Sequence, residues 1–246
     1  MLPLRDDNPT RRFPILTVLL IALNIGLFAY QSTKPDPQRF ATTTELAASK
    51  SGIVCEFSVI PDRVLNGTAP TGDPCVALNR KHARLTGLVT HQFIHASWFH
   101  VLGNMLFLWI FGNNIEDRLG RVRFLPFYLL CGILAALGQG LTDPSSTVPL
   151  IGASGAISGI LGAYFLLFPR VRVLSLVAIF PLRLPAWLVL GAYITLQFLY
   201  TGGQAQQGQG GVAYWAHIIG FVAGFVLILP FLAGRGPDRT DRRIAT

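Results

Sequence analysis

Charged side chains are scarce in this chain. Only 13% of its 246 residues are Asp, Glu, Lys or Arg, whereas soluble domains carry about a quarter. Hydrophobic residues make up 51% of the chain, and the mean hydropathy is +0.49. This composition excludes an ordinary soluble domain and predicts a protein that crosses a membrane several times.

Charge is absent from the interiors of six apolar stretches. They cover approximately residues 13–30, 96–113, 122–141, 149–168, 185–200 and 212–233. Most approach the roughly 20 residues that a spanning helix needs, although the second and fifth are short or interrupted. We expect Val173–Pro181 to form a re-entrant piece or an early turn of the fifth helix. The sequence therefore predicts an all-α polytopic membrane protein, a bundle of six transmembrane helices.

Basic residues are missing from two short loops, at about 142–148 and 201–211. Most Lys and Arg residues instead flank the opposite ends of the predicted helices. The positive-inside rule then places the N-terminus and the C-terminus in the cytoplasm. The net charge of +8 is accordingly a signal of topology. Because no basic face clusters on a soluble module, no nucleic-acid partner is predicted.

The apolar stretches divide the chain into three parts. Residues 1–12 are a cytoplasmic N-terminus, 13–233 are the membrane domain, and 234–246 are a disordered cytoplasmic tail. The first helix lacks a small-residue cleavage site and is expected to be a retained signal anchor. The outer loop 31–90 is rich in turns and irregular. The loop Thr201–Gly211 is either a simple connector or a mobile cap over the outer face.

Cysteine is also rare, with three residues in the chain. Cys131 lies in the third apolar stretch and is expected to be a buried thiol. Cys55 and Cys75 both fall in the outer loop. In an oxidising compartment they could form a disulfide, and the sequence leaves open whether they do.

Few polar side chains lie inside the apolar stretches, so each needs a reason. Ser154 stands in the run GASG and His217 in the run AHIIG. Each lies a few residues inside a predicted helix that enters from the outer face. At a rise of 1.5 Å per residue, both lie roughly 5–10 Å below the outer edge. A hydroxyl and an imidazole at equal depth are the components of a serine nucleophile and its base.

Small residues follow both polar positions. Gly155-xxx-Gly159 and Gly220-xxx-Gly224 form faces on which membrane helices pack backbone to backbone. One interpretation is that these are packing motifs alone and that Ser154 bonds a carbonyl of its own helix. The histidine on a second small-faced helix favours the other interpretation. Close packing would bring the two side chains to the roughly 3 Å that a general base requires.

Two further polar residues lie in the outer half of the second predicted helix. His100 and Asn104 are spaced so that they share one helix face, and both can donate hydrogen bonds. Serine attack on a peptide carbonyl creates an oxyanion that such donors stabilise. The backbone N–H of Ser154 is a third candidate donor. Alternatively, the two side chains only bond neighbouring helices.

A metal site is considered because His91 and His95 are spaced as a ligand pair. The motif H-E-x-x-H is absent, and no buried carboxylate completes a site. The sequence therefore predicts neither a metal nor a cofactor. We expect His95 to shape a water-accessible entrance.

Three separated motifs together resemble the rhomboid intramembrane serine proteases. They are His91-xxx-His95-xxxx-His100-xxx-Asn104, GASG around Ser154, and AHIIGFVAG around His217. The resemblance covers about residues 85–225. Gly112-xxx-Glu116-xxx-Gly120 also resembles a signature of the family, in which Glu116 would be structural.

The resemblance implies a six-helix rhomboid-like bundle with a Ser–His dyad and no third carboxylate. Ser154 would be the nucleophile, His217 the base, and His100 and Asn104 the oxyanion stabilisers. Structural roles would fall to Gly152, Gly155, Glu116 and His95. The implied function is an intramembrane serine endopeptidase that cleaves single-pass transmembrane substrates near the outer face of the lipid bilayer. The expected location is a bacterial plasma membrane.

Two departures from the family pattern stand out. Thr86-Gly87 stands near the place of the usual Trp-Arg pair. Ser158 replaces an aromatic residue, so that a ring stacked on the base is expected to be lost. The alternative function is a catalytically silent rhomboid-like scaffold that binds membrane clients. A small transporter is disfavoured because the chain lacks intramembrane charges and paired broken helices.

Overall fold

The computed structural model describes residues 1–35, 50–67, 83–204 and 213–234. Several predictions lie wholly or partly outside these residues. They concern the pairing of Cys55 with Cys75, most of the loop Thr201–Gly211, and nearly all of the tail 234–246.

Each predicted apolar stretch contains a helix. The long helices are α1 (Ile15–Ser32), α8 (Arg121–Thr142) and α11 (Tyr214–Leu232), and the shorter ones include α9 (Ser154–Leu167) and α10 (Ala186–Gln204). By length and composition, three helices in the described part of the chain could cross a membrane. A fourth is added if the pair Leu85–Phe93 and Trp98–Leu119, bent by 88°, is counted as one span. The count of six spans stays a prediction.

The second predicted helix is built from three consecutive pieces. These are α6 (Trp98–Phe107), a π-helical turn η3 (Leu108–Gly112) and α7 (Asn113–Leu119). Before it, α5 (Ala83–Thr90) continues into a short 3₁₀ turn, η2 (His91–Phe93). The side chain of Ser97 accepts a hydrogen bond from the backbone N–H of His100 and so caps α6.

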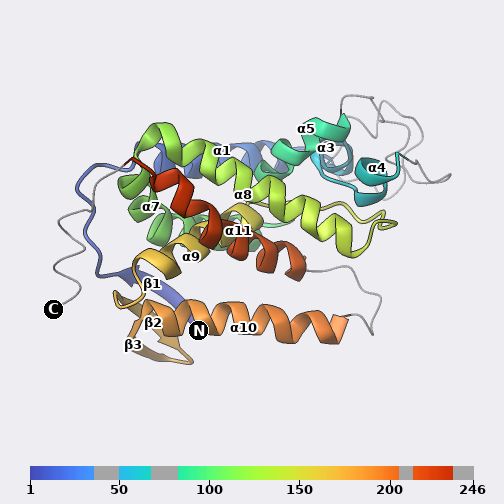
Figure 1. Cartoon of the computed structure of the whole chain (residues 1–246). Coiled ribbons are helices and arrows are strands. Elements are labelled where there is room, and N and C mark those ends of the chain that lie inside the picture. The colour runs from blue at the N-terminus through green and yellow to red at the C-terminus, as the bar shows by residue number, and fades with distance from the viewer. Residues whose placement is uncertain (36–49, 68–82, 205–212, 235–246) are drawn as a thin grey trace.

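The outer loop was predicted to be irregular, and in its described part this was wrong. It forms α3 (Lys50–Phe57), α4 (Pro61–Leu65) and α5, which gather at one end of the molecule (Figure 1). Local chemistry explains α4, because Pro61 stands at its first turn and Asp62 adds a negative charge there. The prolines that suggested turns therefore include one that begins a helix.

A three-stranded antiparallel sheet corrects the all-α prediction. Its strands are β1 (Leu2–Asp6), β2 (Arg172–Val177) and β3 (Phe180–Pro185), in the order β1-β2-β3. The segment Val173–Pro181 is thus neither re-entrant nor helical. Val177 pairs with Phe180, which leaves a two-residue turn in which Ala178 has a positive φ of 52°. Glycine and asparagine are the usual signals for such a turn, and neither is present.

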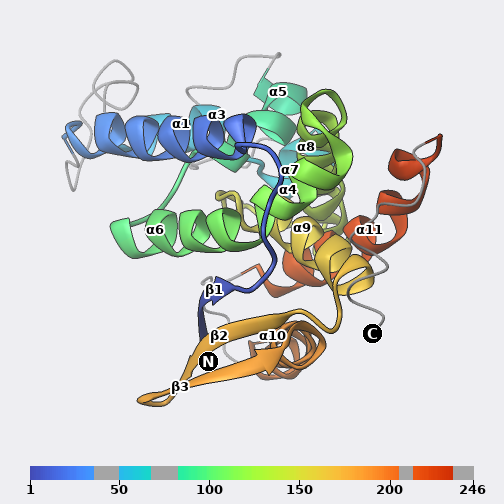
Figure 2. The ribbon, with the colours of Figure 1, turned by 90° about the vertical axis from the view of Figure 1, so that its left-hand side faces the viewer.

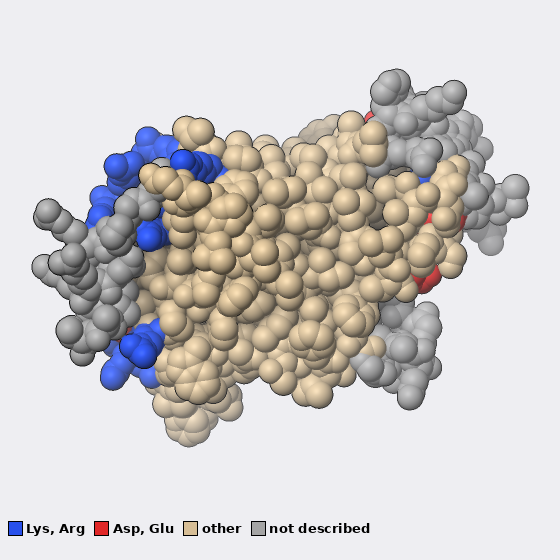
Figure 3. All heavy atoms as spheres, in the orientation of Figure 1, with Lys and Arg blue, Asp and Glu red and all other residues tan. Residues whose placement is uncertain are grey.

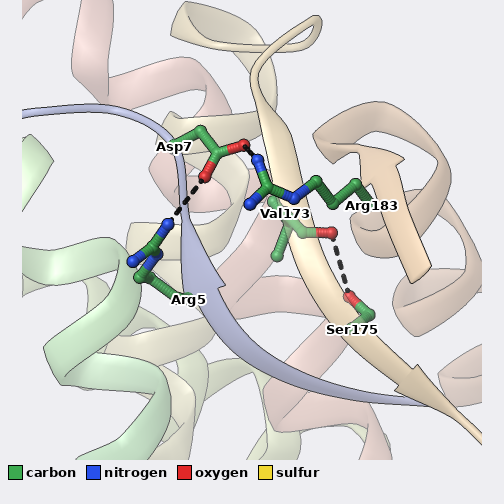
Figure 4. A network of polar contacts seen from close by, with 5 residues as sticks. All are labelled: Arg5, Asp7, Val173, Ser175 and Arg183. Atoms are coloured by element: carbon green, nitrogen blue, oxygen red, sulfur yellow. Dashed lines mark hydrogen bonds and ion pairs between the residues drawn. The ribbon is translucent and has the colours of Figure 1, made fainter. Parts of the chain in front are cut away.

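The N-terminal residues belong to the packed structure. Asp6 accepts hydrogen bonds from the hydroxyl of Tyr164 at 2.6 Å and from the amide of Asn114 at 2.8 Å. Burial raises the pKa of Asp6 to about 6, although the hydrogen bond from Tyr164 acts in the opposite direction. The next residue, Asp7, forms ion pairs with Arg5 and Arg183 (Figure 4). Residues 1–12 are therefore fastened to β3, α7 and α9.

Glu116 fastens the start of α1. Its carboxylate accepts hydrogen bonds from the backbone N–H groups of Leu16 and Thr17 at 3.0 and 2.7 Å, and from the Thr17 hydroxyl at 2.8 Å. The first N–H groups of a helix have no partner within it, and Pro14 offers no side-chain cap. A carboxylate from α7 thus caps a helix about a hundred residues earlier.

Charge and apolar surface are segregated on the molecule. Lys and Arg gather at the end where α7 and the sheet lie, and the middle of the face shown carries almost none (Figure 3). Large apolar side chains are exposed over the helices, among them Phe99, Val122 and Leu229. Such a surface suits the hydrocarbon region of a bilayer.

Helix α9 lies at the centre of the fold. Every residue from Gly155 to Tyr164 is buried. Figure 2 shows α1, α3 and α5 on one side of the molecule and α10 with the sheet on the opposite side. The core includes Phe111, Tyr128, Ile160 and Leu161.

Candidate active site

Ser154 and His217 meet near the beginnings of two helices. Ser154 is the first residue of α9, and His217 lies in the first turns of α11. The hydroxyl oxygen of Ser154 is 2.8 Å from Nε2 of His217. This distance is within the reach of a nucleophile and its general base. The structure thus brings together the two residues that the sequence predicts as nucleophile and base.

Glycines explain why α9 and α11 approach so closely. A side chain on Gly220 would collide with the carbonyl oxygen of Gly155, and one on Gly224 with that of Gly159. A side chain on Gly162 would meet the carbonyl of Phe221. The predicted small-residue faces therefore pack backbone to backbone, as the sequence suggested. The beginning of α11 is also held by Gln139, which accepts a hydrogen bond from Ala216 at 3.0 Å.

The loop before Ser154, residues 150–153, is held by residues that precede α6, namely Val59 and His91. Leu150 and Val59 exchange two backbone hydrogen bonds of 2.7 and 3.1 Å. The N–H of Gly152 donates to the carbonyl of His91 at 2.8 Å. Gly152 has a φ of +113°, which residues with side chains rarely adopt. These contacts fix the backbone that leads into α9 and thereby position Ser154, its first residue.

His100 and Asn104 lie against this loop. An added Cβ on Gly152 would be 2.7 Å from Nε2 of His100 and 3.8 Å from Nδ2 of Asn104. The backbone N–H of Ala96 donates to Nδ1 of His100 at 3.4 Å, so the ring hydrogen is on Nε2, the atom nearer Gly152. Nδ2 of Asn104 is buried, and it has no hydrogen-bond partner among the described residues. Two hydrogen-bond donors, Nε2 of His100 and Nδ2 of Asn104, therefore lie beside the loop that precedes Ser154.

The sequence predicted that His95 shapes a water-accessible entrance. This prediction was wrong, because the side chain of His95 is fully buried. Its Nε2 accepts a weak hydrogen bond of 3.4 Å from the backbone of Ala153, and its ring packs edge-on against His100. His91 is buried too, with Nδ1 2.9 Å from the carbonyl of Gly87. Over the described ranges, no three His, Cys, Asp or Glu residues are placed to hold a metal.

Helix α10 contributes two residues to the site that no sequence motif signals. Tyr193 shares a hydrogen bond of 2.7 Å with Ser158, and its ring lies 6.4 Å from that of His217, inclined by 36°. Position 158 supplies no ring, as expected, but a tilted aromatic ring approaches His217 from α10 instead. Gln197, one turn further along α10, places Oε1 2.9 Å from Nδ1 of His217.

The chain belongs to the rhomboid family. The model of the rhomboid domain matches residues 82–234, a range that contains the Ser154–His217 pair and its neighbours in α6, α9, α10 and α11. The chain is therefore an integral membrane protein of a family of intramembrane serine proteases.

Named relatives agree with this assignment. The chain is 33% identical over 212 residues to RHOMBOID-like protein 1 of Arabidopsis thaliana, covering 86% of this chain and 46% of that protein. It is 28% identical over 158 residues to rhomboid protease GlpG of Yersinia pestis, covering 62% and 49%. It is 30% identical over 141 residues to rhomboid protein 1, mitochondrial, of Saccharomyces cerevisiae, covering 56% and 39%. The matches span half or less of each relative.

Proposed function

We propose that this protein is an intramembrane serine endopeptidase. The observation that carries the proposal is the 2.8 Å contact between the hydroxyl of Ser154 and Nε2 of His217, formed by two apolar helices of a rhomboid domain. No charged group is needed for this pair to act, since a neutral imidazole can accept the serine proton. The protein acts as an enzyme through a Ser–His dyad and requires no cofactor.

The reaction proceeds through an acyl-enzyme. Oγ of Ser154 forms a bond to the scissile carbonyl carbon as Nε2 of His217 takes its proton. The oxyanion accepts hydrogen bonds from His100, Asn104 and the N–H of Ser154, which is free within its helix because it is the first residue. His217 then returns the proton to the leaving amine as the carbon–nitrogen bond breaks. Water hydrolyses the ester by the same route in reverse.

The substrates are single-pass transmembrane proteins in the lipid bilayer. A peptide must leave its helix before attack, because helical carbonyls are hydrogen-bonded and shielded. The α9 helix has 14 residues and is about 21 Å long, shorter than the hydrocarbon core of about 30 Å. If the last residue of α9, Leu167, lies at the inner boundary, Ser154 lies about 9 Å below the outer one.

We further propose the orientation and location of the chain. The segregated Lys and Arg residues (Figure 3) support a cytoplasmic N-terminus and C-terminus. Residues 13–233 then form one membrane domain of six spans, with cleavage near the outer face. A bacterial plasma membrane is the proposed location.

Covalent labelling tests the dyad directly. Purified protein in detergent is treated with a fluorophosphonate probe, in parallel with Ser154→Ala and His217→Ala. We expect the wild type alone to be labelled. Absence of labelling in the wild type, beside a labelled rhomboid control, would favour the silent scaffold. Cleavage of a model single-pass substrate in liposomes by the wild type and not by Ser154→Ala would then establish the protease.

A further inference from the structure

The second ring nitrogen of His217 has a specific partner. Nδ1 lies 2.9 Å from Oε1 of Gln197, while Nε2 lies 2.8 Å from Oγ of Ser154. With its amide oxygen facing the ring, Gln197 accepts a hydrogen bond, and the matching tautomer of His217 carries its hydrogen on Nδ1. The lone pair of Nε2 then faces the serine hydroxyl. This is the tautomer that a general base needs.

The position of Gln197 is itself fixed by α10. Tyr193 lies one helical turn earlier and shares a hydrogen bond with Ser158 of α9, which is four residues beyond the nucleophile. Its ring also packs beside those of Phe107 and His217. Residues spaced by four share one helix face. The contact with Ser158 thus holds the same face of α10 that presents Gln197 to the base.

We propose that Gln197 is a positioning residue that fixes the tautomer and the orientation of His217. The inference rests on the proposed function, and it assigns the dyad a neutral third member, contributed by α10. The amide serves as an acceptor without bringing a charge into the apolar interior, where ionised groups are costly. His217 would otherwise be free to turn or to adopt the tautomer whose Nε2 carries a hydrogen.

Loss of this acceptor should slow catalysis without weakening substrate binding. Partners that orient histidine ligands of metals are worth on the order of 10- to 100-fold, and we expect a similar loss here. Gln197→Met keeps the length of the side chain and removes the acceptor. Gln197→Glu restores an oxygen that can accept from Nδ1. Leu199→Ala is the matched control, since Leu199 lies on the same helix and is 67% exposed.

The test compares these variants by cleavage of a model transmembrane substrate and by the rate of fluorophosphonate labelling. We expect Gln197→Met to lower kcat and the labelling rate by the same factor and to leave KM unchanged. Gln197→Glu should recover most of the loss, and Leu199→Ala should match the wild type. A Gln197→Met variant that reacts at the wild-type rate, or one whose defect Gln197→Glu does not relieve, overturns the inference.

Failure of the proposed function has a different signature. A wild type that is not labelled refutes the dyad itself, whereas a labelled wild type with a normal Gln197→Met variant refutes only the role of Gln197. ¹⁵N NMR of the wild-type histidines needs no variant at position 197. The signals of His217, identified by their loss in His217→Ala, should show a hydrogen on Nδ1. A hydrogen on Nε2 instead would overturn the proposal even if Gln197→Met does not fold.

Discussion

At the scale of single residues, Asn104 is the sharpest test of the oxyanion site. Its Nδ2 is buried and beside Gly152, so Asn104→Ala removes a donor that supports little other structure. We expect kcat to fall by roughly 10²-fold or less, with KM nearly unchanged. Steady-state cleavage kinetics measure this, and Leu102→Ala, on the exposed side of α6, serves as the control. An equal loss in both variants would contradict the assignment.

Gly152 is a second test at this scale. Gly152→Ala introduces a Cβ 2.7 Å from the ring of His100 at a φ of +113°, and such strain costs on the order of 1–3 kcal/mol. We expect a lower thermal midpoint together with strongly reduced phosphonate labelling. Gly103→Ala is the control, because an added Cβ there meets nothing within 4 Å. Wild-type labelling of Gly152→Ala would show that this loop does not position Ser154.

Residue chemistry could be predicted where a motif carries it. Ser154 can be recognised by the motif GASG, and His217 as a histidine in an apolar stretch. The glycines that flank them predict that their two helices pack closely. Gln197 gives no such signal, because its role depends on the rotation of α10 about its axis. Tyr193 was missed for the same reason. The sequence shows only that position 158 is not aromatic. The folded chain brings a ring, that of Tyr193, to the base from another helix.

At the scale of elements, the contact between α9 and α11 sets the geometry of the dyad. Gly224→Ala would drive a methyl group into the carbonyl of Gly159, and overpacking of this kind costs about 1–3 kcal/mol. We expect the helices to separate, so that labelling of Ser154 falls even though every site residue is intact. Gly191→Ala in α10, where the space is open, should label normally. Normal labelling of both variants would contradict the prediction.

Helices were easier to predict than strands in this chain. Each apolar stretch is long enough to signal a helix whatever its partners. The sheet is different, because β1 exists only by pairing with β2, and the turn at Ala178 lacks glycine or asparagine. Helices α3, α4 and α5 were not predicted. They are stabilised by packing against α8 and the loop before Ser154, which cannot be deduced from local composition.

At the scale of the whole molecule, Asp6 links the N-terminal strand to α7 and α9 and makes this link sensitive to pH. The pKa of Asp6 is about 6 in the folded protein, above its ordinary value of 3.8, so the folded state binds the proton more tightly. Its contribution to stability is therefore complete below about pH 4 and is lost as pH rises through about 6. Asp6→Asn stays neutral and should remove this dependence.

Thermal unfolding of the two proteins in detergent between pH 4 and pH 7.5 measures the effect. We expect the thermal midpoint of Asp6→Asn, relative to that of the wild type, to increase as pH rises. Taking the difference between the two proteins cancels the titration of all other groups. A constant difference across this range would show that Asp6 is not buried as described.

The pairing of β1 with β2 also bears on the order in which the protein is made. Leu2 pairs with Leu176, so the ribosome must add more than 170 residues before β1 can meet its neighbour. Contacts so distant along the chain form late. Until the hairpin emerges, the carboxylate of Asp6 stays in water and the hydroxyl of Tyr164 lacks its acceptor. The sheet can therefore close only after α9 has been synthesised and its Tyr164 can receive the strand.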